Sequence, residues 1–434
     1  MDTRKTAHTE VDHEHLIRYV REFAPFLIER ASGSYIYDQT GRAILDFTSG
    51  QMCATVGHNH PAVVEAVEQG CRQVMHLLSW FLSPPVIELC NRLADMLPPS
   101  LQKVLLLNTG GESNEVALRI AKLHSGKFEV AGLSASYHGL TAGAGSLTYS
   151  TGRKGYGPAS VGTMVIPAPN CYRCPIRQCP QQCKLACLEA GFELIDSQSV
   201  GSLAAFIAEP VISAGGVIVP PPGYLARLKE LCRARDMLLI LDEAQTGLGR
   251  MGTNFAYEHE NVVPDILTLS KTLGGGLPLS ATIVSPEVEQ DCYEKGFMHI
   301  SSHVSDPLPA LVGLAVLDVL KRENLSRNAA EMGQRLQNGL LDMQKRYHVV
   351  GDVRGRGLLW GVEIVKDRDT REPDHDLGSA ISNRCLELGL SMNIVHFPGM
   401  SSVWRIAPPL TVSEEEIDSG LTILDQATRE CVDI

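Results

Sequence analysis

The chain has 434 residues, 44% hydrophobic and 20% charged, which is the composition of a globular protein with room for two or three domains. Its 38 basic and 50 acidic residues give a net charge of −12 without any lysine- and arginine-rich run, which argues against a nucleic-acid partner. Neither a long apolar run nor a signal-like N-terminus occurs, so no membrane span is expected. We therefore expect a cytoplasmic protein whose cysteines are reduced thiols.

The order of sequence patterns predicts an α/β protein with three segments. Residues 1–58 contain a β-hairpin pattern at 33–50 and are expected to contribute to the smaller domain. Residues 59–307 alternate short apolar runs with helix-like segments, which is typical of βα units and a mainly parallel sheet. Residues 308–434 contain two amphipathic helical patterns and a hairpin pattern at 349–367, which indicate a smaller α/β domain.

Apolar runs in the middle segment are typical of buried strands, and each ends in polar or glycine residues. Ligands of open α/β sheets bind beyond the carboxyl ends of the strands, so these polar endings predict a binding site. The runs are 103–111, 203–210, 238–245 and 266–276.

The first of these runs ends in a glycine pair, Gly110–Gly111, directly before a helical pattern. A glycine loop that opens a helix offers free backbone N–H groups and a positive dipole end, which suit a phosphate. The sequence matches neither the Walker loop nor the dinucleotide fingerprint, and an ordinary helix start is the alternative.

Two charged residues, Asp242 and Lys271, lie at the ends of later apolar runs. A buried aspartate needs a cation, and a desolvated lysine has a lowered pKa that suits Schiff-base chemistry, although it could instead extend out of the sheet edge. Together with a phosphate loop at 109–111, these side chains are the three contacts that pyridoxal 5′-phosphate requires.

The sequence resembles the class III aminotransferases, pyridoxal-phosphate enzymes of fold type I. The motifs that carry this resemblance are, in chain order, "NTGGESNE", "SYHGLT", "AEPV", "LDEAQTGLGR" and "LSKTLGGGLP", and it extends from about residue 20 to the C-terminus. It implies a large cofactor-binding domain with a mainly parallel sheet, a smaller α/β domain, amino-acid and keto-acid substrates, and a homodimer or homotetramer.

The resemblance also implies roles for individual residues. Lys271 would form the Schiff base, Asp242 would bind the ring nitrogen, Tyr137 would stack on the ring and Gln245 would contact the 3-oxygen. The phosphate would be held by Thr109, Gly110 and Gly111, with Ser302 reaching the phosphate of a neighbouring subunit. Glu209 would lie close to the cofactor, either paired with a cation near the substrate or in a supporting position.

Four further segments resemble the branch of the family that decarboxylates 2,2-dialkylglycines: "LDFTSGQMCATVGHNHP", "SSHVSDPLPA", "GLSMNIVHFPGM" and "WRIAPPLTVSEEEID". This implies that Gln51 holds the carboxylate that is lost, Arg405 holds a carboxylate in the ring plane, and Lys271 transfers protons. A structural turn at Gln51 and a structural ion pair at Arg405 are the alternatives. A non-decarboxylating aminotransferase and a catalytically silent binding or scaffold protein are the rival functions.

Departures from that branch occur at Tyr137, where tryptophan is usual, at Leu140, where methionine is usual, and at Ala214, where serine is usual. We expect these changes to affect the choice of substrate rather than the type of reaction.

The resemblance implies one structural K⁺ or Na⁺ site, since oxygen ligands suit hard cations. Its ligands would be the side chains of Ser79, Ser302 and Asp306 with the carbonyls of Leu77 and Val304. Capping of the following helix by Asp306 is the alternative.

A cysteine-rich insertion, with Cys171, Cys174, Cys179, Cys183 and Cys187, could hold structural zinc or form a thiol-rich surface loop.

Overall fold

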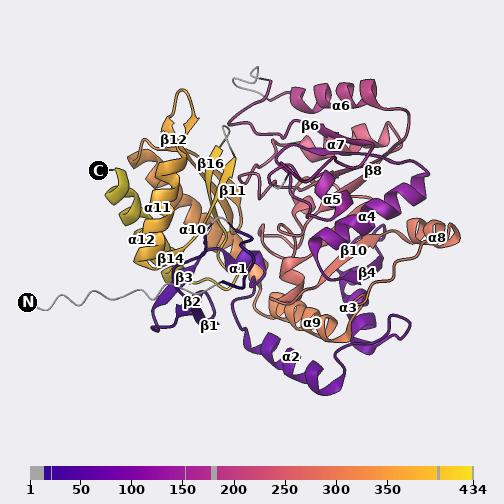
Figure 1. Cartoon of the computed structure of the whole chain (residues 1–434), viewed down its shortest axis with the longest axis horizontal. Coiled ribbons are helices and arrows are strands. Elements are labelled where there is room, and N and C mark those ends of the chain that lie inside the picture. Colours follow the sequence, from indigo (N-terminus) through magenta and orange to yellow (C-terminus); the bar gives the residue numbers. More distant parts are fainter. Residues whose placement is uncertain (1–13, 21, 152, 177–182, 398–400, 433–434) are drawn as a thin grey trace, which may run out of the picture.

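The computed structural model describes residues 14–20, 22–151, 153–176, 183–397 and 401–432. A large α/β domain lies beside a smaller domain to which both ends of the chain contribute (Figure 1). Among the described residues, no helix combines the length and apolar character needed to cross a membrane.

The large domain contains a seven-stranded sheet of order β4-β10-β9-β8-β7-β5-β6. The pairs β9-β8, β8-β7, β7-β5 and β5-β6 are parallel, whereas β10 is antiparallel to both of its neighbours. The predicted mainly parallel sheet is therefore confirmed, with β10 as its exception. The strands are β4 (Lys103–Leu107), β5 (Glu129–Leu133), β6 (Thr163–Ile166), β7 (Leu203–Ala208), β8 (Leu238–Asp242), β9 (Ile266–Leu269) and β10 (Ser280–Val284).

Both faces of this sheet are buried, because successive side chains of a strand point to opposite faces. In β7, Phe206 and Ala208 join one apolar cluster with residues of α6 and α7, while Ala205 and Ile207 join another with residues of α4. The helices of this part are α2 (Pro61–Gln73), α3 (Pro84–Asp95), α4 (Gly110–Ser125), α5 (Ala142–Ser146), α6 (Ala186–Gln198), α7 (Tyr224–Arg233), α8 (Pro286–Glu294) and α9 (Pro307–Arg322), with 3₁₀ turns η1 (Ala256–Glu260) and η2 (Lys271–Gly274).

The smaller domain is built on two sheets, one of order β1-β2-β3-β14 and one in which β11-β12-β16-β15 is joined by β13 at β12. Its strands are β1 (Ile28–Ser32), β2 (Tyr35–Asp38), β3 (Ala43–Asp46), β11 (Val350–Arg356), β12 (Leu359–Asp367), β13 (Glu372–Pro373), β14 (Leu390–Ser391), β15 (Asn393–Phe397) and β16 (Ser401–Ile406). Its helices are α10 (Leu325–Arg346), α11 (His375–Leu388) and α12 (Glu414–Val432). Between the domains lies the short turn α1 (Ser49–Met52).

The hairpins predicted at 33–50 and 349–367 are present as β2-β3 and β11-β12. Strand β14 pairs in parallel with β3, so the N-terminal segment does add strands to the C-terminal part of the chain. Helix α9 packs against α2, α3 and η2, which are elements of the large domain, although the predicted boundary between residues 307 and 308 assigns it to the smaller one.

Candidate active site

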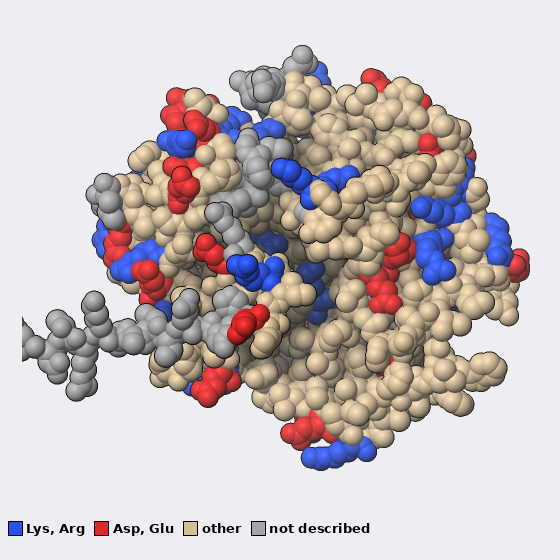
Figure 2. Space-filling model, viewed as in Figure 1, with Lys and Arg blue, Asp and Glu red and all other residues tan. Residues whose placement is uncertain are grey.

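A cavity of about 880 Å³ lies at the carboxyl ends of β8 and β9, within the size range of ligand pockets. It is lined by the large domain and, from the smaller domain, by Arg405 and the segment 393–395. The space-filling view shows a hollow between the two halves of the molecule, with basic side chains inside it (Figure 2). The sequence-predicted residues that line the cavity are Gln51, Thr109, Gly110, Gly111, Tyr137, Asp242, Gln245, Lys271 and Arg405.

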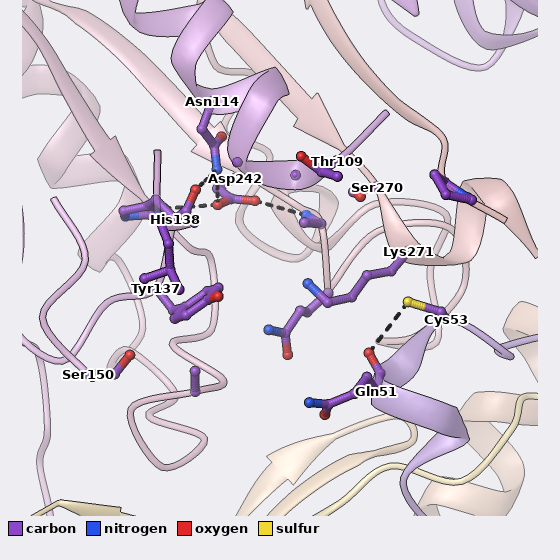
Figure 3. A pocket seen from close by; sticks show the side chains of 18 of the residues that line it. Gln51, Cys53, Thr109, Asn114, Tyr137, His138, Ser150, Asp242, Ser270 and Lys271 are labelled. Atoms are coloured by element: carbon purple, nitrogen blue, oxygen red, sulfur yellow. Dashed lines mark hydrogen bonds and ion pairs between the residues drawn. The ribbon is translucent and has the colours of Figure 1, made fainter. Parts of the chain in front are cut away.

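Asp242 ends β8 and is buried at the floor of this cavity. Its Oδ2 accepts a hydrogen bond of 2.7 Å from Nδ2 of Asn114 and lies 2.8 Å from Nδ1 of His138, while its Oδ1 accepts one of 3.0 Å from the amide of Ala244 (Figure 3). Burial alone would raise the pKa of Asp242, but the hydrogen bond and charge interaction with His138, the Ala244 amide and nearby Lys271 lower it below the ordinary value. The carboxylate therefore stays ionised.

His138 and Asn114 are functional residues to which the sequence analysis gave no role. Asn114 also donates to the carbonyl of His138 at 2.9 Å and accepts a hydrogen bond of 2.7 Å from Oγ1 of Thr268. Nε2 of His138 has no hydrogen-bond partner among the described residues. Both residues stand inside motifs that carry the family resemblance, "NTGGESNE" and "SYHGLT". Their place in these motifs was the one sequence signal that could have identified them. Neither the spacing nor the residue types indicated a contact with Asp242.

Glu243, the next residue, points to different partners. It accepts hydrogen bonds from the amides of Ala256 at 2.7 Å and Tyr257 at 2.9 Å, and from Oγ1 of Thr246 at 3.2 Å. Burial raises the pKa of Glu243 to about 7. Because none of its partners lines the cavity, Glu243 holds the chain after β8 in place, and Asp242 is the acid of this pair that faces the pocket.

Lys271 follows β9 and begins η2 with a φ of 45°, in the left-handed region that non-glycine residues seldom adopt. Strained backbone of this kind is concentrated at functional sites. Its side chain extends into the cavity (Figure 3). Burial lowers the pKa of Lys271, although the nearby Asp242 acts in the opposite direction. A larger share of the amine is therefore neutral, and hence nucleophilic, than in a lysine exposed to water.

The predicted phosphate loop is the N-terminus of α4. Thr109 caps the helix by accepting a hydrogen bond of 3.3 Å from the amide of Glu112. The amides of Gly110 and Gly111 belong to the first turn, where the N–H groups have no partner within the helix. Gly139 has a φ of +113°, and a Cβ atom there would stand 2.4 Å from Cα of Gly111. This contact requires a glycine and brings the loop of Tyr137 and His138 against the helix end.

These residues fit pyridoxal phosphate. The cavity contains the free amides of a helix start, an ionised buried acid and a lysine of lowered pKa. It also has two buried side-chain oxygens, Oε1 of Gln245 and Oγ of Ser150, that have no hydrogen-bond partner among the described residues. A ligand with a phosphate, a protonated ring nitrogen and a polar ring substituent would satisfy such groups.

Arg405 lies on β16 and is buried at the cavity wall. Its backbone pairs with β12 and β15, but among the described residues its side chain has no hydrogen-bond or ion-pair partner. The predicted alternative of a structural ion pair therefore finds no support there. Burial lowers the pKa of Arg405, with Glu209 acting in the opposite direction. A buried guanidinium facing a cavity is suited to a carboxylate from a ligand.

Gln51 belongs to the turn α1, in which Ser49, Gly50, Gln51 and Met52 have φ values of 47°, 49°, 60° and 64°. Each non-glycine residue in this left-handed conformation costs roughly 1–2 kcal/mol. The turn is held by Asp46, whose Oδ2 accepts a hydrogen bond of 2.9 Å from the amide of Gly50. Strain of this kind directs Gln51 to the cavity (Figure 3).

Fully buried Arg250 connects this turn to the smaller domain. It donates to Oγ of Ser49 at 3.3 Å, to the carbonyl of Leu358 at 3.1 Å and to the carbonyl of Pro408. Burial lowers the pKa of Arg250 to about 9. Since Pro408 follows the strand that carries Arg405, this one side chain fixes both of the segments that bring Gln51 and Arg405 to the cavity.

Glu209 follows β7 and lies outside the cavity lining. It accepts hydrogen bonds from the amides of Tyr137 at 2.8 Å and Ser213 at 3.1 Å. It therefore holds the backbone of Tyr137, and its influence on Arg405 is through charge rather than direct contact. Burial raises the pKa of Glu209 to about 7.

The buried acids Glu209 and Glu243 predict a pH dependence of stability. The pKa of each rises from 4.5 to about 7 on folding, so the stability that each contributes is complete below pH 4.5 and is lost as the pH rises through 7. We expect the free energy of unfolding of the cofactor-free protein, measured with urea, to be lower at pH 8 than at pH 5.5. A free energy of unfolding that is higher at pH 8 than at pH 5.5 would contradict the raised pKa values of these two acids.

The residues predicted to bind K⁺ or Na⁺ lie around the start of α9. Ser79 and Ser302 are exposed, Leu77 is partly exposed and Val304 is buried. Asp306 is the N-cap residue of α9, but its side chain accepts no hydrogen bond from the helix, so the capping alternative is not observed. Its two oxygens contact histidines instead, as described below. The alkali site and the reach of Ser302 to a neighbouring subunit stay predictions.

The cysteine insertion lies only partly within the described residues, and Cys179 is outside them. Cys171, Cys183 and Cys187 form no disulfide among the described residues. Burial, together with neighbouring cysteines of the insertion, raises the pKa of Cys171 to about 11. These thiols therefore lie near one another. Both alternatives for the insertion, a thiol-rich surface loop and bound zinc, stay predictions.

The model of the family described as "Aminotransferase class-III" matches residues 18–428. The chain is a class III aminotransferase. It is 49% identical to an uncharacterized aminotransferase of Schizosaccharomyces pombe, over 95% of this chain and 92% of that protein. It is 34% identical to the leucine/methionine racemase of Thermococcus litoralis, over 93% of this chain and 91% of that protein.

Solved structures of transaminases share the fold of this aminotransferase. An amine transaminase from an uncultivated Pseudomonas species, in a form that contains pyridoxal phosphate, superposes with a TM-score of 0.89. The two are 29% identical, and the superposition covers 97% of this chain and all of the other. The fold-type-I architecture is thereby confirmed, and the family is that of pyridoxal-phosphate enzymes.

Proposed function

We propose that this class III aminotransferase is a 2,2-dialkylglycine decarboxylase. It converts a small 2,2-dialkylglycine, such as 2-aminoisobutyrate or isovaline, into a ketone and CO₂, and transfers the amino group to pyruvate to give L-alanine. The observation that supports this proposal most is that Gln51 and Arg405 line one cavity with Lys271, which provides two separate partners for a carboxylate.

Pyridoxal phosphate, when bound, supplies a ring that accepts the electron pair left by a broken bond to Cα. In our proposal the chain prepares the site for this chemistry. Lys271 would anchor the cofactor and move protons, while Asp242, kept ionised by His138, would hold the proton on the ring nitrogen. Tyr137 would pack on the ring, Gln245 would contact its oxygen, and the N-terminus of α4 would bind the phosphate.

The choice of bond would depend on which side chain binds the substrate carboxylate. Gln51, with donors on its amide, would hold the carboxylate that is lost as CO₂. Arg405 would hold the carboxylate of alanine when the C–H bond is the one to be broken. One site thereby serves both half-reactions, and Lys271 transfers the proton in each.

The substrate class follows from the remaining lining. Small or apolar residues line the same cavity as Gln51 and Arg405, including Ala214, Leu140 and Ile394. They leave room for two short alkyl groups and offer no charge to a polar substituent. A non-decarboxylating aminotransferase is the second candidate, favoured by the similarity to the S. pombe protein, which is named as an uncharacterized aminotransferase.

Substitution of Gln51 by alanine tests the assignment. We expect release of CO₂ from 2-aminoisobutyrate to fall about 10–100-fold, since a hydrogen bond to a charged group contributes about 1.5–3 kcal/mol. The half-reaction that starts from L-alanine should change far less. Both rates are measured in single turnovers, with Cys53→Ser, a change at a neighbouring cavity residue, as the control that should not alter their ratio.

Equal losses in the two half-reactions of Gln51→Ala would show that Gln51 does not select the bond. Wild-type enzyme that forms alanine from another amino donor, but releases no CO₂ from any small dialkylglycine, would support the ordinary aminotransferase instead.

We also propose a homodimer or homotetramer. Between α2 and α3, apolar side chains that are each more than half exposed follow one another closely in sequence, as expected of a surface covered by another subunit. They are Met75, Leu78, Trp80, Phe81 and Leu82.

A further inference from the structure

Two histidines converge on Asp306 at the start of α9. Nδ1 of His76 lies 2.7 Å from Oδ1 of Asp306, and Nδ1 of His303 lies 2.6 Å from Oδ2. The candidate ligand atoms all lie within 4.8 Å of one another, and the two imidazole rings are 5.0 Å apart. Among the described residues, this is the single group of three such side chains close enough to share one ion.

The three residues come from separate parts of the chain. His76 lies in the connection between α2 and α3 and is 230 residues from Asp306, whereas His303 belongs to the segment that leads into α9. The Asp306 side chain is 8% exposed, and those of His76 and His303 are 51% and 62% exposed. In the single chain, a buried carboxylate thus meets two partly exposed imidazoles.

The types of ligand atom in this cluster favour one class of cation over others. Two imidazole nitrogens and one carboxylate oxygen suit a borderline transition metal such as Zn²⁺, whereas alkali ions prefer oxygen ligands alone. Three protein ligands leave a fourth position of a tetrahedral site for water. The net charge of −12 also favours a cation.

We propose that His76, His303 and Asp306 bind one divalent transition-metal cation, with Zn²⁺ the best match. This site shares only Asp306 with the alkali site predicted from the sequence, and it does not depend on the proposed decarboxylase activity. The ion has a structural role, because none of its three ligands lines the active-site cavity.

The segment that carries His303 also contacts the phosphate loop. Oγ of Ser301 donates to Oε1 of Glu112 at 3.1 Å, and the amide of Ser305 donates to the carbonyl of Leu106 at 3.1 Å. Glu112 in turn accepts from the amide of Asn108 at 3.0 Å, next to the predicted phosphate ligand Thr109. The cation therefore ties the α2–α3 connection to the edge of the cofactor site.

The test is metal binding by the holoenzyme after treatment with a chelator and desalting. We expect titration calorimetry with ZnCl₂ to show one ion per chain, and the affinity to fall at least about 100-fold in His76→Ala and in His303→Ala, beyond the loss typical of a supporting residue. His303→Asn keeps a donor for Asp306 but not a good metal ligand, so it should lose binding as well. Both side chains are more than half exposed in the single chain, and circular dichroism with size-exclusion chromatography verifies that the variants keep their fold and assembly.

Two further measurements separate this site from others. His124→Ala removes a histidine whose Nδ1 lies 2.7 Å from Oδ2 of Asp291 but which has no third candidate ligand among the residues that the structure describes. This variant should leave the zinc affinity unchanged. Co²⁺ bound by nitrogen and oxygen gives weak visible bands, whereas the cysteine insertion would give an intense near-ultraviolet thiolate band.

Full zinc affinity in both alanine variants would overturn the proposal. It would also be overturned by a purely thiolate-type cobalt spectrum, or by stabilisation with KCl in a protein that binds neither Zn²⁺ nor Co²⁺.

Discussion

Replacement of Lys271 by alanine is expected to lower kcat by at least about 10⁴-fold, the upper range of general acid–base catalysis by one side chain. Its amine lies in the cavity, and burial lowers its pKa toward the neutral, reactive form. In our proposal, the variant loses both the covalent anchor for the cofactor and the group that moves protons at Cα. Rapid-quench kinetics with 2-aminoisobutyrate and pyruvate measure the loss.

A second readout identifies the anchor independently of activity. Borohydride treatment of the wild-type holoenzyme should leave a pyridoxyl group on the peptide that contains Lys271, detectable by mass spectrometry. Lys271→Arg keeps the charge but cannot form the bond, so neither Lys271→Arg nor Lys271→Ala should carry the modification. Modification of another lysine in the wild type would contradict the assignment. A wild-type protein that stays colourless with added cofactor would instead support the catalytically silent alternative.

The fold was predictable from sequence where local signals were strong. Strands such as β7 and β8 are continuous apolar runs that end in polar residues, and the hairpin β11-β12 has glycines at its turn. The antiparallel strand β10 was not predicted, because an apolar run carries no information on strand direction. The packing of α9 on α2 and α3 was not predicted either. An amphipathic pattern indicates that one face of a helix is buried, but it does not indicate which elements cover that face.

The candidate site was predictable in part for similar reasons. Asp242 and Lys271 stand out because a charge at the end of a buried strand needs a partner. His138 and Asn114 could not be assigned, since their contact with Asp242 joins residues 104 and 128 positions apart along the chain. Arg250 was missed as well, because it acts through carbonyl groups that a sequence pattern does not reveal.

The exchange of Asp242 for asparagine should lower kcat by about 10²–10⁴-fold, because loss of one member of a buried charge pair costs about 3–5 kcal/mol. The variant keeps the shape of the side chain and can still accept from Asn114, but it no longer stabilises a proton on the ring nitrogen. His138, buried beside it, also loses its charged partner. We expect the visible absorption spectrum of the holoenzyme to change in this variant in addition to the loss in kcat.

The neighbouring acid provides the matched control. Glu243→Gln alters a carboxylate that is equally buried and one residue away, but whose partners are the amides of Ala256 and Tyr257 outside the cavity. It should lower the free energy of unfolding by about 1–3 kcal/mol, the cost of an impaired buried hydrogen bond, while kcat of the folded enzyme changes little. If instead Glu243→Gln reduced kcat as strongly as Asp242→Asn, general damage to the end of β8 would explain both losses, and Asp242 would have no separate role toward the cofactor.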